Sequence, residues 1–131
     1  MSGIANDSSM EWAIRALDWC VRRHHVISSN IVNRDTPGYK AADVDFRRVM
    51  EQIGTEDEGI LRRTDPVHLP RLGGIPSQVL TVKETSERPD GNSVNLAEEM
   101  SHLVENNYTY QALLKHVNGK LKAIKLAIHG A

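Results

Sequence analysis

The chain has 131 residues, with 16 Lys and Arg against 17 Asp and Glu, a single Cys, and six aromatic residues (two Trp, three Tyr, one Phe). This length supports one small domain with a thin core. The net charge of −1 lacks the basic excess that binding to a phosphate backbone requires, so we expect no nucleic acid partner. No run of consecutive apolar residues exceeds three, which excludes a transmembrane helix and the apolar centre of a cleaved secretory signal. By these rules alone the protein would stay in the cytoplasm.

The first predicted element is a helix from about Ser9 to Asn33. A stripe with spacings of three and four runs along it through Ile14, Leu17, Val21, His24, Ser28 and Ile31. Two of these six residues are polar, so the stripe is weak, but Cys20 widens the apolar face. The helix should end near Thr36, because a residue before Pro37 is pushed out of the helical region and Gly38 supplies a flexible turn.

The middle of the chain, residues 41–93, predicts only short elements. Phe46 to Ile53 forms an amphipathic segment, and the β-rich run from Gln78 to Thr85 reads as a strand that ends in the turn Arg88-Pro89-Asp90-Gly91. Pro and Gly residues between positions 66 and 76 break any long element there. We expect a small hairpin or at most a three-stranded patch.

The clearest pattern lies in the last part of the chain, from Leu96 to Ile128. Apolar or aromatic residues follow one another there at alternating spacings of four and three, with Asn107 as the one polar member: Leu96, Met100, Leu103, Tyr110, Leu114, Val117, Leu121, Ile124 and Ile128. This line, which we call the seam, is typical of a coiled coil and predicts a helix of roughly 48 Å. Asn95 and Glu98 are spaced as a capping box at its start.

The expected fold is therefore mainly α. Long N- and C-terminal helices, within residues 1–40 and 94–131, would pack as a coiled coil, and residues 41–93 would form a small irregular or β middle segment. Such a two-helix pair buries one face only and is marginal as a monomer. Partner chains would supply the missing contacts.

Residues arranged for chemistry are absent from the sequence. None of the six His residues has the spacing of a zinc site. Cys20 lies in a helix without an identifiable base, and no glycine-rich phosphate loop is present. Asp43 and Asp45 lack apolar surroundings that would separate their pKa values. We expect no enzyme activity, no cofactor, no metal and no small-molecule substrate, and instead a structural or adaptor protein.

One segment, from Ser29 to Lys40, resembles the signature of bacterial flagellar rod and hook proteins. In that family an Asn-Ile-Ala-Asn run ends the first helix and Thr-Pro-Gly-Tyr follows; the corresponding residues here are Asn30, Ile31, Asn33, Thr36, Pro37, Gly38 and Tyr39. The segment from Asp90 to Leu96 is similar to the proximal rod subunits in particular. Val32 departs from the usual Ala. Physically, Asn30 and Asn33 could bond the free carbonyls at the helix end while Tyr39 packs its ring.

The resemblance implies a non-enzymatic subunit of the proximal rod of the flagellar basal body, which crosses the periplasm and transmits torque. Its terminal helices would pack in the inner layer of a helical tube, beside other rod subunits, the rod adaptor protein and the membrane-embedded ring. Such subunits pass through the flagellar type III export apparatus without a cleaved signal peptide. The alternative is a cytoplasmic coiled-coil adaptor or export chaperone that holds a partner helix on the seam, and location in the cell separates the two.

Overall fold

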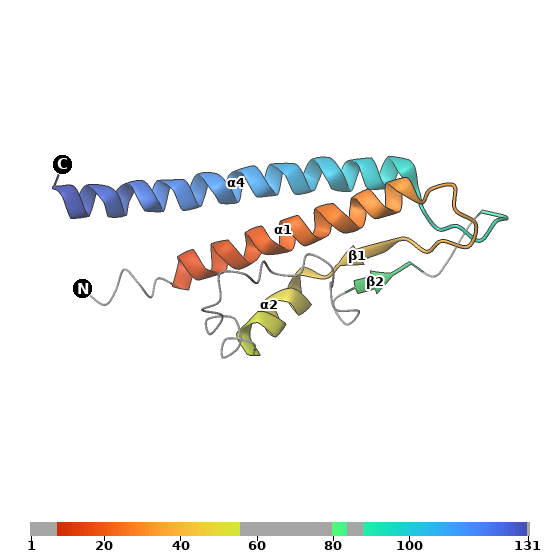
Figure 1. Cartoon of the computed structure of the whole chain (residues 1–131), viewed down its shortest axis with the longest axis horizontal. Helices are drawn as coiled ribbons and strands as arrows, with labels where there is room; N and C mark the ends of the chain where they lie inside the picture. The colour runs from red at the N-terminus through yellow and green to blue at the C-terminus, as the bar shows by residue number, and fades with distance from the viewer. Residues whose placement is uncertain (1–7, 56–79, 84–87, 131) are drawn as a thin grey trace, which may run out of the picture.

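The computed structural model describes residues 8–55, 80–83 and 88–130. Two long helices, α1 (Ser8–Val32) and α4 (Leu96–His129), lie side by side and run in opposite directions (Figure 1). The short elements β1 (Ala42–Val44), α2 (Phe46–Thr55) and β2 (Leu80–Val82) lie between them in sequence. The expected mainly α fold, with a small β segment in the middle, is confirmed.

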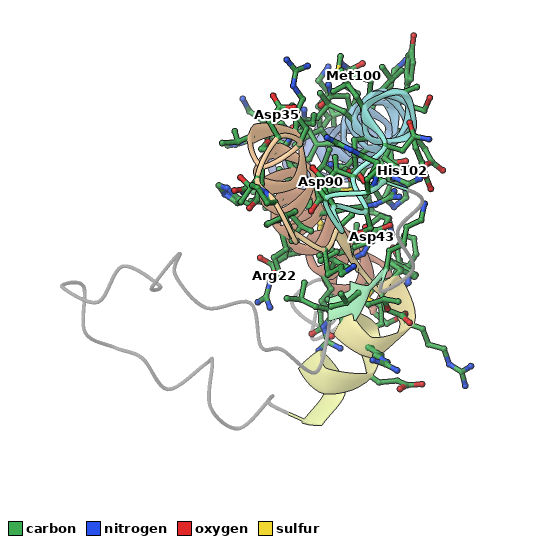
Figure 2. All side chains as sticks on the ribbon, turned by 90° about the vertical axis from the view of Figure 1, so that its right-hand side faces the viewer. Arg22, Asp35, Asp43, Asp90, Met100 and His102 are labelled. Carbon is green, nitrogen blue, oxygen red and sulfur yellow. The ribbon has the colours of Figure 1, made fainter. Side chains whose placement is uncertain are left out.

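Helix α1 is covered on two sides. One side contacts α4 and the other contacts the small elements, so that α1 lies between them when the molecule is seen end-on (Figure 2). The residues that α1 buries are mostly small or polar: Ala13, Ala16, Cys20, Arg23, Val26, Ile27 and Asn30. Most of these recur at spacings of three and four, which is the period of one helix face. The helix ends at Val32, one residue before the predicted bound at Asn33, and the turn through Thr36 and Pro37 follows it.

The middle elements form a small core beneath α1. Strands β1 and β2 pair antiparallel, with Ala42 opposite Val82 and Val44 opposite Leu80. Because α2 and residues 56–79 separate the two strands in sequence, this two-stranded patch is no tight hairpin. The predicted strand is confirmed over Leu80–Val82. The Pro- and Gly-containing stretch between positions 66 and 76 lies outside the described residues.

Helix α2 is held by a cap and by aromatic contacts. The Asp45 carboxylate accepts bonds from the backbone N–H groups of Arg47 at 2.9 Å and Arg48 at 3.3 Å, which caps the first turn. The Phe46 ring packs edge-on against Trp19, with the ring centroids 4.9 Å apart. A small apolar cluster of Val26, Val44 and Val49, flanked by Trp19, Ala42 and Leu80, completes this core. This core is small, as the low number of aromatic residues in the sequence predicts.

Helix α4 begins at the predicted cap. The Asn95 side chain accepts bonds from the backbone N–H groups of Ala97 at 3.1 Å and Glu98 at 3.4 Å. The Glu98 carboxylate does not complete the capping box and accepts instead from Lys83 Nζ at 3.0 Å. With 34 residues, α4 is about 51 Å long, and it extends well past the start of α1 (Figure 1). Within the described ranges, no helix has the length and apolar character needed to cross a bilayer.

Candidate assembly site

The signature segment forms the place where the end of α1 meets the start of α4. We call this region the junction; it comprises residues 29–42 and 88–99. After α1 ends, the chain turns, with the Thr36 N–H donating to the Asn33 carbonyl at 3.1 Å and the Tyr39 N–H donating to the Thr36 carbonyl at 3.2 Å. Gly38 adopts a positive φ of 73°, which other L-residues rarely adopt. Pro37 lies exposed at the tip of this turn.

Asn30 makes four side-chain hydrogen bonds in the junction and is fully buried. Its Nδ2 donates to the Ala42 carbonyl at 2.7 Å and to Glu99 Oε2 at 3.1 Å. Its Oδ1 accepts from the Ala42 N–H at 3.1 Å and from the Tyr39 hydroxyl at 3.2 Å. Asn30 therefore does not bond the carbonyls at the end of its own helix. It ties α1 to β1 and α4.

The other signature residues act more locally. Asn33 Nδ2 donates to the Ser29 carbonyl in the last turn of α1 at 2.8 Å, and Asn33 Oδ1 accepts from the Thr36 hydroxyl at 3.1 Å. Tyr39 is anchored by its hydroxyl group, which also lies 3.2 Å from Ser29 Oγ. Ile31 is half-buried. Val32, where the family has Ala, is 80% exposed, so its larger side chain contacts little within this chain.

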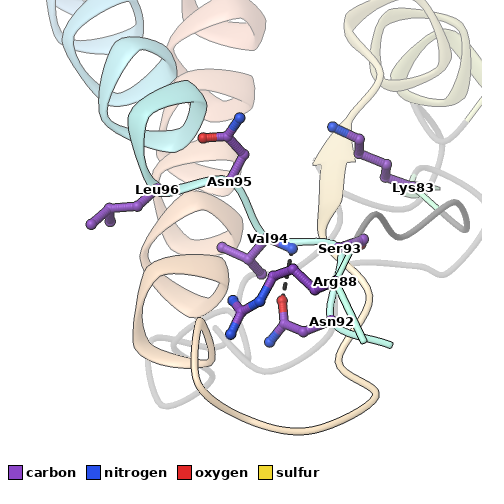
Figure 3. A pocket seen from close by; sticks show the side chains of 7 residues that line it. All are labelled: Lys83, Arg88, Asn92, Ser93, Val94, Asn95 and Leu96. Carbon is purple, nitrogen blue, oxygen red and sulfur yellow. Dashed lines mark hydrogen bonds between the residues drawn. The ribbon is translucent and has the colours of Figure 1, made fainter. Parts of the chain in front are cut away.

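Asn92, which the sequence did not single out, caps the end of α1. Its Nδ2 lies within hydrogen-bond distance of three carbonyls, those of Asn33 (2.9 Å), Arg34 (3.0 Å) and Thr36 (2.8 Å). Its Oδ1 accepts from the Val94 N–H at 2.7 Å (Figure 3), and the residue is fully buried. The resemblance of residues 90–96 to rod subunits marked this loop as important. It gave no sign of which residue reaches back to α1.

Backbone contacts join the two loops of the junction directly. The Gly38 N–H donates to the Asp90 carbonyl at 2.9 Å, and the Ser93 N–H donates to the Tyr39 carbonyl at 3.0 Å. A Cβ atom on Gly91 would lie only 3.6 Å from the Gly38 Cα, so the loops approach closely. Beside them lies an open pocket of about 350 Å³, lined by Lys83, Arg88 and residues 92–96 (Figure 3).

Polar side chains also occupy the contact between α1 and α4. Asn106 Nδ2 donates to the Cys20 carbonyl at 2.9 Å. Arg23 donates to both carboxylate oxygens of Asp43, at 3.0 and 3.2 Å, and lies 3.6 Å from a Glu105 oxygen. Burial raises the pKa of the Glu99 carboxyl, an effect partly offset by the bond from Asn30. These bonds fix one register between the helices, because a shift of either helix would leave buried polar groups unpaired.

The structure divides the predicted seam into two sets of residues. Leu103, Val117 and Ile124 are half-buried, whereas six seam residues are exposed: Leu96, Met100, Tyr110, Leu114, Leu121 and Ile128. The residues that α4 buries against α1 are Glu99 and Asn106. These precede the seam residues Met100 and Asn107 by one position, which is about 100° around the helix. In this first part of α4 the contact with α1 therefore lies to one side of the seam.

The weaker stripe of α1 also lies one position to the side of the contact between the two helices. Ile14 is 54% exposed and Val21 is 39% exposed, while the adjacent Ala13 and Cys20 are buried. The stripes of the two helices come together at the edge of their contact. A shallow pocket of about 230 Å³ lies there, with Val21 and His24 on one side and Asn107 and Tyr110 on the other.

The chemistry that this site offers is hydrogen bonding and apolar contact. In the part of the chain that the structure describes, no three His, Cys, Asp or Glu side chains are grouped as a metal site would require. Burial raises the pKa of the Cys20 thiol, so the thiol stays protonated and unreactive. The arrangement is suited to holding helices together.

Comparison with known proteins points the same way as the signature segment. No family model matches the chain. The chain is 34% identical over 109 residues to the flagellar basal body rod protein FlgB of Bacillus subtilis, an alignment that covers 82% of this chain and 83% of that protein. It is 31% identical over 125 residues to FlgB of Yersinia enterocolitica (90% of this chain, 91% of that protein) and 29% identical over 125 residues to FlgB of Escherichia coli, with the same coverage. The chain therefore belongs to the FlgB family of flagellar basal body rod proteins.

Proposed function

We propose that this protein is a structural, non-enzymatic subunit of the proximal rod of the flagellar basal body, which assembles through its terminal helices and transmits torque. Family membership supports the rod assignment. The observation that carries the role of the helices is the edge where α1 and α4 meet. There the larger apolar side chains of both helices lie exposed, while smaller and polar ones fill the contact between them.

The exposed edge is continuous along the pair. Because Cys20 is bonded to Asn106 in an antiparallel arrangement, Val21 lies beside Asn107, and Ile14 lies near Leu114. Exposed apolar residues that gather in this way mark a site of contact with another protein. A helix laid along the edge would remove this surface from water, at about 25 cal/mol per Å² buried.

The α1–α4 pair is suited to bearing load because its parts are held by directional bonds. Asn30 and Asn92 tie the helix ends to the loops, and the Arg23 and Asn106 contacts fix the register of the helices. A force on one helix is then passed to the other without sliding. This supports a role in transmitting torque within the rod.

The partners follow from the same proposal. Different faces of each subunit would contact successive neighbours, since such heterologous contacts generate open helical assemblies. The neighbours are other rod subunits, the rod adaptor protein and the membrane-embedded ring. The subunit would reach the periplasm-spanning rod through the flagellar type III export apparatus, without cleavage of a signal peptide.

Purified basal bodies provide the test. We expect mass spectrometry to find the chain in basal bodies with an intact N-terminal sequence, and a strain that lacks its gene to be non-motile and without rods. A strain that lacks a flagellar gene unrelated to the rod serves as the control for basal-body recovery. Complete basal bodies without this chain, together with the chain in the cytosol, would instead support the adaptor or export chaperone.

A further inference from the structure

The second half of α4 carries a line of basic side chains beside the exposed seam residues. The line consists of residues that each follow a seam position by one: Lys115, Lys122, Lys125 and His129. Their spacings of seven, three and four place them on one face of the helix, about 100° around from the seam. All four are exposed. We call this line the basic ridge; its three Lys residues span about 15 Å.

The basic ridge is not neutralised within the part of the chain that the structure describes. None of its Lys side chains forms an ion pair with a described carboxylate, and α4 has no Asp or Glu after Glu105. The other two helices pair Arg with an acid one turn away, Arg22 with Asp18 at 2.8 Å in α1 and Arg47 with Glu51 at 3.0 Å in α2. Like charges at such spacings destabilise a helix. A nearby carboxylate from outside the described chain would remove this repulsion.

The helix dipole accounts only for the end of the basic ridge. Cations stabilise a helix in its last turn, and the effect falls off beyond that turn. His129 lies in the last turn of α4, whereas Lys115 and Lys122 lie about four and about two turns before the helix end. The charge of these two lysines therefore does not stabilise α4 itself.

Exposed apolar side chains run along the basic ridge. The seam residues Leu114, Leu121 and Ile128 are 36%, 51% and 68% exposed, and α4 continues past the start of α1 (Figure 1). A narrow apolar line with charges beside it is the pattern of a contact between helices, in which the flanking charges select the partner. Leu126, on the opposite side of the helix, is 61% exposed, so α4 lacks the single apolar face of a helix that lies on a membrane.

A second copy of this chain offers few carboxylates to the basic ridge. Glu99 is buried against Asn30. Most other carboxylates of the described ranges already lie within 4 Å of a Lys or Arg nitrogen of the same chain: Asp18, Asp35, Asp43, Asp45, Glu51, Asp90, Glu98 and Glu105. The acidic counterpart of the ridge is therefore expected on a different protein.

We propose that the basic ridge and the exposed seam residues beside it bind an amphipathic helix of a different protein, one that carries Asp or Glu beside its own apolar line. The two apolar lines pack against each other, and carboxylates of the partner lie against Lys115, Lys122 and Lys125. The inference rests on the proposed rod function and names the chemistry of one neighbour within it.

Carbodiimide cross-linking of purified basal bodies tests the proposal, because the reagent joins a Lys amine to a carboxylate that it contacts directly. We expect Lys122 or Lys125 to be joined to an Asp or Glu of a different protein, identified by mass spectrometry of the linked peptides. Lys83 and Glu98, which lie 3.0 Å apart, should be joined within the chain and serve as the internal control. A Lys83–Glu98 link without any link from the ridge overturns the proposal, and so do ridge lysines joined only to carboxylates of this chain's own sequence.

Charge reversal provides a second measurement. Lys122→Glu with Lys125→Glu should lower the amount of chain recovered in basal bodies roughly tenfold, because like charges then face each other. Lys122→Arg with Lys125→Arg keeps the charge and should assemble like the wild type, and circular dichroism should show equal helix content in all three proteins. Normal incorporation of the Glu variant overturns the inference and leaves the rod function in place. A wild-type chain that is absent from basal bodies refutes the rod function, and this inference with it.

Discussion

Buried asparagines hold this helix pair together at the positions where many helix pairs use leucine. Asn30 and Asn92 are fully buried, and Asn106 is 2% exposed. A buried amide costs free energy unless it is bonded. Asn30 and Asn92 are bonded through both Nδ2 and Oδ1, so they stabilise only the arrangement that satisfies them. Asn106 is bonded to α1 through Nδ2, and its Oδ1 has no partner among the described residues. These side chains therefore specify one arrangement of α1, α4 and the loops.

Replacing Asn92 by Ala should destabilise the protein strongly. The change removes the Asn92 donor from three carbonyls of the turn after α1. It also leaves the buried Val94 N–H without its acceptor, and a buried unpaired group costs about 1–3 kcal/mol. We expect a loss of about 2–4 kcal/mol in the free energy of unfolding, measured by urea denaturation. Asn118→Ala, at an exposed position of α4, is the matched control and should stay within about 0.5 kcal/mol of the wild type. Equal effects of the two changes would contradict the capping role of Asn92.

Glu99 should make stability depend on pH in an unusual direction. Because burial raises its pKa in the folded state, the folded protein binds this proton more tightly than the unfolded chain, whose glutamates titrate near 4.3. The contribution of Glu99 is therefore present below that value and is lost as the pH rises through the raised pKa. Glu99→Gln keeps an oxygen for Asn30 and removes the charge, so this variant should lack that loss. Urea denaturation across this pH range checks it, and identical pH profiles for the two proteins would refute it.

At the scale of elements, local chemistry made the helix ends predictable. Asn95 caps α4 at the predicted residue, and a turn containing Pro37 and Gly38 follows α1. Such signals act through neighbouring backbone groups, so they can be read from short stretches of sequence. The strand partner of β1 and the role of Asn92 could not be read in this way, because both depend on contacts between residues about 40–60 positions apart.

The rotation of the helices could not be predicted either. A stripe of Leu and Ile indicates where apolar surface lies, and in this chain that surface flanks the contact between α1 and α4. The contact itself uses Ala13, Ala16 and Cys20, whose small side chains allow close approach, together with polar groups that find partners across it. Large side chains such as Leu and Ile dominate a hydrophobic pattern, whereas Ala and bonded polar residues add little to it. The predicted stripe therefore lay one position to the side of the contact.

Two glycines should respond in opposite ways to the same change. Gly38→Ala forces a Cβ into a turn with a φ of 73° and should cost about 1–2 kcal/mol. Gly119→Ala lies within α4, where an added Cβ meets nothing within 4 Å, and should stabilise the monomer by up to about 1 kcal/mol. Thermal unfolding followed by circular dichroism measures both changes. A stabilising effect of Gly38→Ala would show that the turn does not need glycine.

For the whole molecule, folding and assembly depend on different residues of the seam, and substitution by Asp should separate them. Leu103 is half-buried, so Leu103→Asp should lower the free energy of unfolding by about 2 kcal/mol or more. Leu114, 36% exposed, lies on the edge proposed for neighbouring helices. Leu114→Asp should therefore leave the unfolding temperature almost unchanged and abolish motility.

The control for Leu114→Asp is Ala112→Asp. Ala112 is exposed and, two residues away, lies on the opposite side of α4, so this variant should fold and swim normally. Motility in soft agar and the amount of chain in purified basal bodies measure assembly, and circular dichroism measures folding. A motile Leu114→Asp strain would show that the exposed edge of the helix pair takes no part in assembly. A Leu114→Asp protein that unfolds like Leu103→Asp would instead make Leu114 a residue of the monomer core, because its effect on motility would then follow from lost stability.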